Sequence, residues 1–353
     1  MSVAQALARA ADAGIHLLAI PTPFAVGRVN CYLLDDQPLT LIDTGPNSGK
    51  ALDELERQLG AHGRRIEDLE LVILTHQHID HLGLIEIIAE RSGAQVAAID
   101  VAVERLRNFS EDAERDDEHA AGLMRRYGIP ADVVAALRSV SRSFRGWGAH
   151  AEVTRPLADG ETIRLRDRSL AVQHRPGHSP SDTVFWDSER RILFAADHLI
   201  AHISSNPLLS RPLDGGDGRP RALVDYILSL RRTRELPAEL VLAGHGEPVT
   251  NHRALIDERL GLHRRRAAKL QGLISERPRS AYELAQEIWG NIAVTQAFLT
   301  LSEVVGHVDL LIASGLTREA EDPDGVVRFE ATGASGEIEL PGDLEAAGAV
   351  TAP

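Results

Sequence analysis

The chain has 353 residues, a formal net charge of −14 and one cysteine. This length allows one large domain with a smaller one, and it leaves ample chain to bury a core. The acidic balance disfavours a general nucleic-acid binder, although a local basic groove stays possible, and a single cysteine excludes an intrachain disulfide. The single cysteine fits a reducing cytoplasm, where we expect the protein, and no apolar run reaches the roughly 18 residues of a membrane span.

Short apolar runs bounded by turn residues predict the first strands, at residues 15–20, 29–34 and 39–42. Asp43 follows the third run directly and could be a helix cap or a polar residue of a site. Residues 51–59 then have the spacing of an amphipathic helix.

The densest group of ligand-type side chains lies in residues 75–81, between an apolar run and a helical pattern. This arrangement predicts a buried strand, a polar turn and a helix. Imidazole and carboxylate groups suit zinc and similar divalent ions. One turn cannot easily wrap all of them around a single ion, so we infer two neighbouring metals. The side chains concerned are His76, His78, Asp80 and His81.

After a further predicted strand at 95–99, residues 100–148 show apolar side chains at helical spacing among many charges. We interpret this segment as a helical insertion between strands. It could cap a substrate pocket, or it could form an oligomer contact such as that of a homodimer.

The later predicted strands again end in ligand-type residues. These strands are expected at 161–165, 169–174, 183–186, 192–196 and 240–243. His178 follows a Pro-Gly pair, Asp197 follows a strand end, and His245 stands between two glycines. A histidine placed in this way can be aimed into a shared site.

The segment 201–220 is rich in glycine and polar residues and comes soon after Asp197. It could form a pocket wall, in which case His202, Ser204 and Asn206 would contact a substrate, or it could be a simple connection.

From residue 251 the chain is predicted to be helical. Ser280 and Glu283 form a capping-box pattern at the start of one helix, and a hairpin is expected around residues 316–329. Helices followed by such a hairpin resemble a winged-helix domain, for which we favour packing or dimerisation over DNA binding because the hairpin is acidic. The predicted domains are 1–250 and 251–332, with a flexible tail at 333–353.

The H-x-H-x-D-H pattern, the Pro-Gly-His turn, the strand-end aspartate and the Gly-His-Gly turn occur in an order that resembles the metallo-β-lactamase superfamily, and its glyoxalase II-like members in particular. The resemblance implies an α+β fold, an αββα sandwich carrying the helical insertion. It also implies that Asp43 orients a ligand histidine and that Asp80 orients the nucleophile. The implied ligands are His76, His78 and His178 for one metal and Asp80, His81 and His245 for the other, with Asp197 as the bridge.

The function expected from this resemblance is hydrolysis of a small ester, thioester or lactone by a hydroxide held between two zinc ions; iron or manganese could replace zinc. The main alternative is a metal-dependent ribonuclease or phosphodiesterase, for which the basic residues Arg264–Lys269 would be the contact. A third alternative is a flavodiiron-like reductase module, but such proteins usually come with a flavin domain and the sequence shows no flavodoxin-like half. A fourth is a non-catalytic binding protein, which would not need the full ligand set. Cys31, on a predicted strand, is expected to be a core residue.

Overall fold

The computed structural model describes residues 1–213, 216 and 218–343, and contact clustering divides the chain into two compact units. The first unit contains residues 1–113, 144–205 and 236–252. The second contains residues 114–143, 206–235 and the chain from 253 onward. Residues 214, 215 and 217 of the predicted loop 201–220, and residues 344–353 of the predicted tail, lie outside the described residues.

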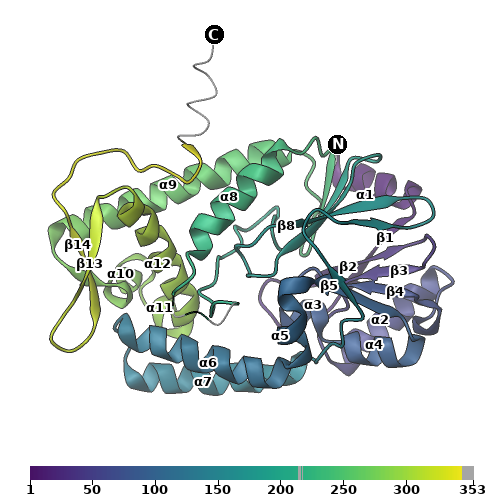
Figure 1. Ribbon diagram of the computed structural model, residues 1–353, viewed down its shortest axis with the longest axis horizontal. Helices are drawn as coiled ribbons and strands as arrows, with labels where there is room; N and C mark the ends of the chain where they lie inside the picture. The colour runs from purple at the N-terminus through teal and green to yellow at the C-terminus, as the bar shows by residue number, and fades with distance from the viewer. Residues whose placement is uncertain (214–215, 217, 344–353) are drawn as a thin grey trace, which may run out of the picture. The chain divides into compact units, whose positions relative to one another are not determined.

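Among the described residues, the first unit holds two sheets (Figure 1). The first sheet has the order β1-β2-β3-β4-β5-β6 and the second β11-β10-β9-β8-β7. The strands of the first are β1 (Ile15–Ile20), β2 (Val29–Leu34), β3 (Thr40–Ile42), β4 (Leu71–Ile73), β5 (Gln95–Ile99) and β6 (Arg155–Leu157). Those of the second are β7 (Thr162–Arg164), β8 (Ser169–His174), β9 (Thr183–Asp187), β10 (Ile192–Ala196) and β11 (Leu240–Ala243). The strand β6 was not predicted.

Both sheets contribute to one hydrophobic core together with helices from the outer layer. Leu41 of β3, Phe194 of β10 and Leu55 of α2 belong to this core, and Cys31 is fully buried in it, as predicted. The packing confirms the predicted α+β sandwich. The helices of this unit are α1 (Val3–Asp12), α2 (Gly49–Ala61), α3 (Ile79–Leu82), α4 (Ile85–Ser92) and α5 (Val103–Arg107).

Parallel pairing places several strand ends at one edge of the first unit. β3, β4 and β5 are parallel neighbours, and β10 is parallel to β11. The two sheets are joined at this edge by main-chain hydrogen bonds. Asn30 N–H donates to the Gly244 carbonyl at 2.7 Å, and Thr183 N–H donates to the Thr75 carbonyl at 3.0 Å. Residues that directly follow these strands are therefore held close together.

The second unit is mostly helical and confirms that the insertion predicted at 100–148 contains helices. Residues 114–143 and 206–235 precede residue 250 but cluster with the C-terminal part, because apolar side chains such as Tyr127 and Leu209 pack in its core. The units and the predicted domains therefore divide the chain differently. The helices are α6 (Phe109–Arg126), α7 (Ala131–Phe144), α8 (Ala222–Glu235), α9 (His252–Glu276), α10 (Ala281–Trp289), α11 (Ile292–Thr295) and α12 (Ala297–Ala313).

A small sheet completes the second unit, with the order β12-β14-β13. The hairpin is that predicted, and the capping box at the start of α10 is present, with Ser280 and Glu283 bonded reciprocally. These are elements that a winged helix would need; the assignment to that fold stays a prediction. The strands are β12 (Arg279–Ser280), β13 (Thr317–Glu321) and β14 (Val327–Ala331), of which β12 was not predicted.

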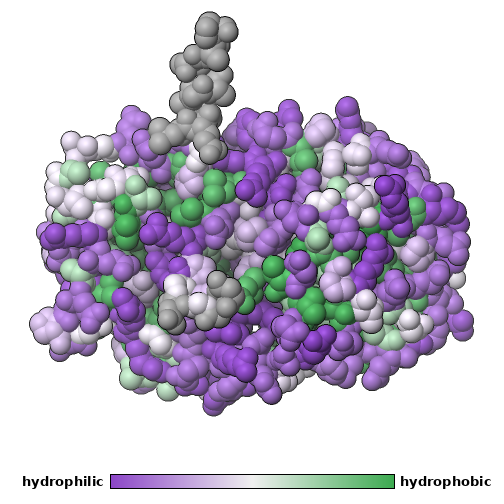
Figure 2. Space-filling view, in the orientation of Figure 1, coloured by the Kyte–Doolittle hydropathy of each residue, from purple (hydrophilic) through white to green (hydrophobic). Residues whose placement is uncertain are grey.

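Hydrophilic residues cover most of the face drawn in Figure 2, and hydrophobic residues gather there in smaller patches. Within the described part of the chain, no helix combines the length and apolar character needed to cross a membrane.

Candidate metal centre

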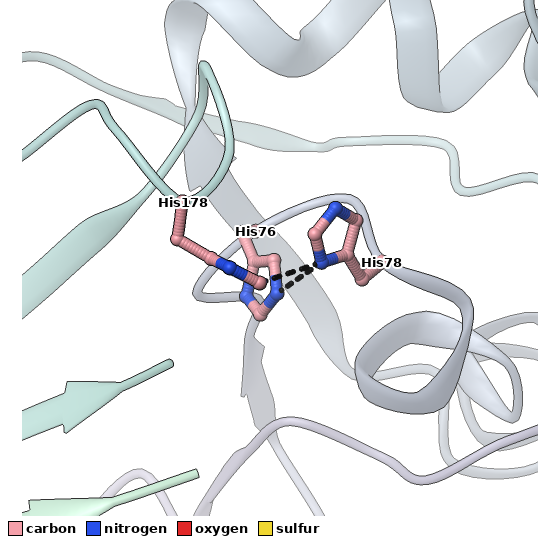
Figure 3. Close-up of side chains that lie close together, drawn as sticks. All are labelled: His76, His78 and His178. Carbon is pink, nitrogen blue, oxygen red and sulfur yellow. Dashed lines mark hydrogen bonds between the residues drawn. The ribbon is translucent and has the colours of Figure 1, made fainter. Parts of the chain in front are cut away.

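Three histidines from two distant segments meet at the edge where β4 and β8 end (Figure 3). Nδ1 of His78 lies 3.1 Å from Nε2 of His76 and 2.9 Å from Nε2 of His178. One ligand atom from each residue lies within 4.8 Å of the others, so the three could hold one ion. His76 is buried, while His78 and His178 are half-buried, so this group is the more accessible one.

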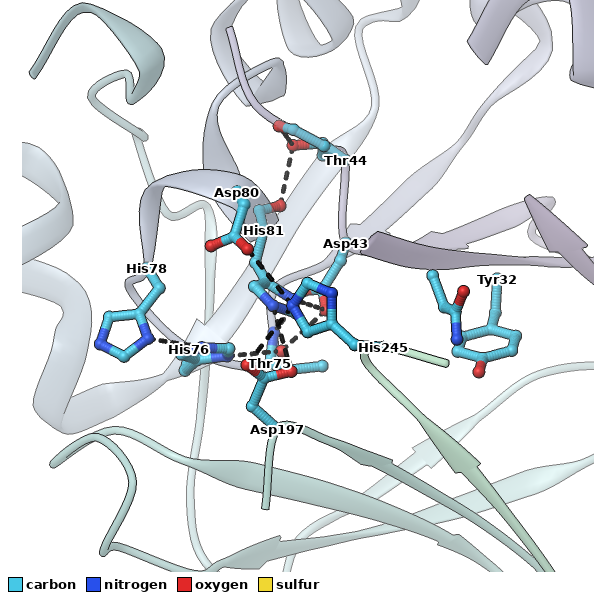
Figure 4. A network of polar contacts seen from close by, with 12 residues as sticks. Tyr32, Asp43, Thr44, Thr75, His76, His78, Asp80, His81, Asp197 and His245 are labelled. Atoms are coloured by element: carbon cyan, nitrogen blue, oxygen red, sulfur yellow. Dashed lines mark hydrogen bonds and ion pairs between the residues drawn. The ribbon is translucent and has the colours of Figure 1, made fainter. Parts of the chain in front are cut away.

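A second group lies beside the first and is buried (Figure 4). Asp80 and His81 come from the short helix α3, and His245 follows β11. Nε2 of His245 is 3.3 Å from a carboxylate oxygen of Asp80. These three residues also have ligand atoms within 4.8 Å of one another, so they could hold a second ion.

Asp197 lies between the two groups. Its carboxylate oxygens are 3.4 Å from Nε2 of His81 and 3.5 Å from Nε2 of both His178 and His245. Asp197 therefore contacts histidines of both groups, which is the position expected of a bridging ligand. It follows β10 directly, and Ala196 before it has a left-handed backbone (φ 44°) that turns the chain toward the site.

Asp43 holds His81 of the second group in position. One of its carboxylate oxygens accepts from Nδ1 of His81 at 2.7 Å, and Thr75 donates to the carboxylate from its N–H at 2.9 Å and its hydroxyl at 2.8 Å. Asp43 also has a left-handed backbone (φ 59°), which aspartate tolerates better than most residues. The contact fixes the ring and the tautomer of His81, so that Nε2 faces Asp197.

The loop that carries His245 is held by the neighbouring strand. Nδ1 of His245 donates to the carbonyl of Arg28 at 2.9 Å. The amide of Asn30 donates to the carbonyls of Ala243 and Gly246, both at 3.0 Å. Sequence patterns gave no sign of these roles for Arg28 and Asn30, because each acts across more than two hundred residues of chain.

The turn that carries His178 has its own anchor. Buried Asp182 accepts from the Ser179 N–H at 2.9 Å and from its hydroxyl at 2.7 Å. Burial raises the pKa of Asp182. A ring nitrogen of His174 bonds to the Pro180 carbonyl at 2.9 Å in the same turn.

A further observation supports metal binding by the candidate ligands. Nε2 of His81, Nε2 of His245 and Oδ1 of Asp197 are buried and have no hydrogen-bond partner among the described residues. Buried polar atoms without partners are costly, and these three are of the N and O types that bind zinc. A cation at this place would satisfy all three.

A family model described as the metallo-beta-lactamase superfamily matches residues 25–245, a range that holds both groups. The chain belongs to this superfamily. Its members bind metal ions, usually zinc, and the chain is a metallo-hydrolase of the superfamily.

Individual proteins of this superfamily show the same relationship. The chain is 34% identical over 301 residues to a probable metallo-hydrolase, YqjP, of Bacillus subtilis (strain 168), covering 84% of this chain and 91% of the relative. It is 26% identical to hydroxyacylglutathione hydrolase GloC of Haemophilus influenzae, over 65% of this chain and 90% of the relative. It is 32% identical to acyl-coenzyme A thioesterase MBLAC2 of Gallus gallus, over 50% of this chain and 56% of the relative.

Solved structures agree with the fold of the superfamily. A metallo-beta-lactamase family protein from Thermus thermophilus matches with a TM-score of 0.71 and 26% identity, covering 90% of this chain and 98% of the other. A beta-lactamase domain protein from Burkholderia ambifaria matches with a TM-score of 0.77 and 25% identity, covering 90% and 92%. The similarity therefore extends well beyond the metal-site motifs.

The protonation states of the candidate ligand histidines favour binding of a cation at this site. Burial lowers the pKa of His76 well below its ordinary value and that of His78 to about 3, so both rings are neutral, the form that binds metals. Burial alone would lower the pKa of His81, but the carboxylates of Asp197 and Asp43 outweigh it and raise the pKa well above the ordinary value. A divalent cation would replace the proton that these carboxylates hold on His81.

The metal-free protein should lose stability on acidification. The folded-state pKa of His78, about 3, lies below the ordinary 6.5, so the unfolded chain binds more protons below about pH 6.5. The free energy of unfolding should therefore fall as the pH drops from 6.5 toward 3, with a slope for this group that approaches about 1.4 kcal/mol per pH unit below about pH 5.5. Urea denaturation of chelator-treated protein at pH 6.5 and 5 measures this. His78→Gln should reduce the pH dependence; an equal slope in the variant and the unaltered protein would refute the explanation.

Asp43→Asn should weaken metal binding without unfolding the protein. Asparagine tolerates the left-handed backbone but lacks the charge that holds His81, and loss of such a supporting carboxylate typically costs 10–100-fold in affinity. Competition with a chelator measures the change. Asp53→Asn, at an exposed position of α2, should bind metal as the unaltered protein does. Identical affinities for all three proteins would argue against this role for Asp43.

The predicted substrate contacts fall in different places. His202 is exposed and lies beside the turn after His245, since a Cβ on Gly246 would be 2.6 Å from its Nδ1. Ser204 has a buried hydroxyl with no hydrogen-bond partner in the described part of the chain. Asn206 belongs to the second unit, where its amide donates to the Leu299 carbonyl at 2.9 Å. Roles in substrate binding stay predictions for all three.

Proposed function

We propose that the protein is a binuclear metallo-hydrolase that cleaves a small acyl thioester, ester or lactone. The observation that carries the proposal is that two of the candidate ligand groups share no member, while a third group of His76, His81 and Asp197 links them. The first is His76, His78 and His178, and the second is Asp80, His81 and His245. Two complete groups, with Asp197 between them, support two ions rather than one.

Two zinc ions would supply hydroxide at neutral pH and would polarise the acyl carbonyl. The chain's own residues have distinct tasks around them. Asp197 would hold the two groups at a fixed separation, because it contacts histidines of both. Asp80 would orient the nucleophile, since its carboxylate faces the site beside His245. Burial of His81 and His245 excludes water from the back of the site, so substrate would approach over His78 and His178.

Thioesters are the first choice among the acyl substrates. Two relatives are named as a hydroxyacylglutathione hydrolase and an acyl-coenzyme A thioesterase. The chemistry agrees, because a thiol has a pKa of about 8.5 and can leave as thiolate without a strong general acid.

The ribonuclease alternative has less support. Its proposed contact was the basic stretch from Arg264 to Lys269, but Arg264 pairs with Asp343 at 2.7 Å and Arg266 pairs with Glu303. Two of the four cations in this stretch are thus neutralised by carboxylates, which weakens its attraction for phosphates. RNA cleavage is therefore an outcome for the test rather than a second proposal.

A substrate panel tests the proposal. Zinc-loaded protein is assayed with an acyl-glutathione, an acyl-coenzyme A, an aryl ester, a lactone and a short RNA. We expect the fastest turnover on a thioester, with loss of activity on chelation and recovery with zinc. Cleavage of RNA alone would overturn the substrate class, and full activity after complete metal removal would overturn the mechanism.

A further inference from the structure

A cavity of about 160 Å³ lies within the second unit, and none of the residues that line it belongs to the metal centre. Three helices supply its lining: α9, the end of α10, and α12 (Figure 1). Neither the superfamily motifs nor the proposed hydrolysis uses its side chains.

Three of the residues that line this cavity are apolar. Leu270 is buried on α9, and half-buried Ile288 and Trp289 come from the last turn of α10. An apolar cavity of about 150 Å³ is large enough for a benzene ring. The indole of Trp289 offers a flat surface against which such a ring can pack.

Three other lining residues are charged, with a net positive balance. Arg266 and Lys269 stand three residues apart on α9, so they project from the same face of the helix. Arg266 forms an ion pair with Glu303 of α12. Lys269 is exposed and has no ion pair or hydrogen bond to any described residue. The lining thus carries two cationic side chains and one carboxylate, which leaves one positive charge without a partner.

His307 also lines the cavity but adds no charge to it. Its Nδ1 donates to the Glu303 carbonyl at 2.6 Å, so its Nε2 must accept from Nδ1 of His263, 3.0 Å away. Burial lowers the pKa of His307, and the ring is neutral at pH 7. Both ring nitrogens are occupied, so Lys269 and the unused donors of Arg266 are the groups left for a ligand.

We propose that this cavity binds a small monocarboxylate with an apolar, preferably aromatic, body. The carboxylate would pair with Lys269 and with the free edge of the Arg266 guanidinium, and the body would pack on Trp289 and Leu270. The cavity volume limits the ligand to about the size of benzoate. The site is independent of the proposed hydrolysis, and it could bind its ligand in the metal-free protein as well.

Binding of benzoate to the full-length protein tests the proposal. Titration calorimetry should give saturable binding with a roughly millimolar dissociation constant, as expected for a ligand with about nine non-hydrogen atoms. Benzamide should bind at least about tenfold more weakly, because the charge-assisted contact is lost. Benzylamine should bind more weakly still. Benzylamine binding as tightly as benzoate, or no saturable binding of benzoate, would overturn the proposal.

Two variants locate the site. Lys269→Gln should weaken benzoate binding about tenfold, whereas Arg265→Gln, an exposed neighbour on α9 that does not line the cavity, should leave it unchanged. Trp289→Phe should keep binding but abolish the benzoate-dependent change in tryptophan fluorescence, since Trp147 and Trp186 lie in the first unit. Equal affinities of the two charge variants, or an unchanged fluorescence response without Trp289, would place the ligand elsewhere and overturn the assignment.

Discussion

Replacing Asp197 by asparagine is expected to lower turnover by about three orders of magnitude while leaving the chain folded. Asp197 contacts His178 of one candidate metal group and His245 of the other, and its Oδ1 has no hydrogen-bond partner among the described residues. Metal catalysis is worth several kcal/mol, and each 1.36 kcal/mol is a factor of ten in rate. Steady-state kinetics on zinc-loaded protein, together with circular dichroism, measures activity and folding separately.

A matched variant separates charge from position. Glu189→Gln makes the same change of charge in the exposed turn between β9 and β10, and it should leave turnover unchanged. If Asp197→Asn keeps both the metal content and the turnover of the unaltered protein, the bridging role is wrong.

Alanine at Gly244 should disrupt the site almost as strongly, although glycine contributes no ligand. A Cβ at this position would lie 2.2 Å from Oδ1 of Asp197 and 2.9 Å from Cε1 of His81. Real Cβ atoms do not approach so closely, and a shift of either buried side chain would displace a candidate metal ligand. We expect loss of most of the bound metal and about a hundredfold lower turnover, consistent with the sensitivity of catalysis to misplacement of about 1 Å.

Gly272→Ala is the control for this substitution. A Cβ there meets nothing within 4 Å, and the residue is exposed within α9, so alanine should raise helix stability by up to about 1 kcal/mol and leave metal binding unchanged. The bound metal is measured in both glycine variants, and only Gly244→Ala should have lost it. Full metal content in Gly244→Ala would show that the backbone approach at this position is not required.

Strand-end patterns explain why much of the site could be predicted from sequence. The run before His76 is apolar and buried, and it is followed by a dense set of ligand-type residues, so the strand and its turn were recognisable. The parallel neighbours β3 and β4 then bring Asp43 and the histidine turn to one edge. Local periodicity and chain order together were sufficient for this part.

Other features depend on contacts that no local pattern records. The hydrogen bonds of Asn30 to the loop of His245 span more than two hundred residues. The short strands β6 and β12 have few residues, and their pairing rather than their composition defines them. The grouping of residues 114–143 with the C-terminal helices likewise depends on which apolar faces pack together.

Metal content measured by elemental mass spectrometry tests the central claim most directly. Protein purified under metal-replete conditions should contain about two zinc ions per chain. His78→Ala and His245→Ala, which each remove a ligand from only one group, should each retain about one. A metal-replete protein without bound metal, or with a single ion that both variants lose, would contradict the binuclear site.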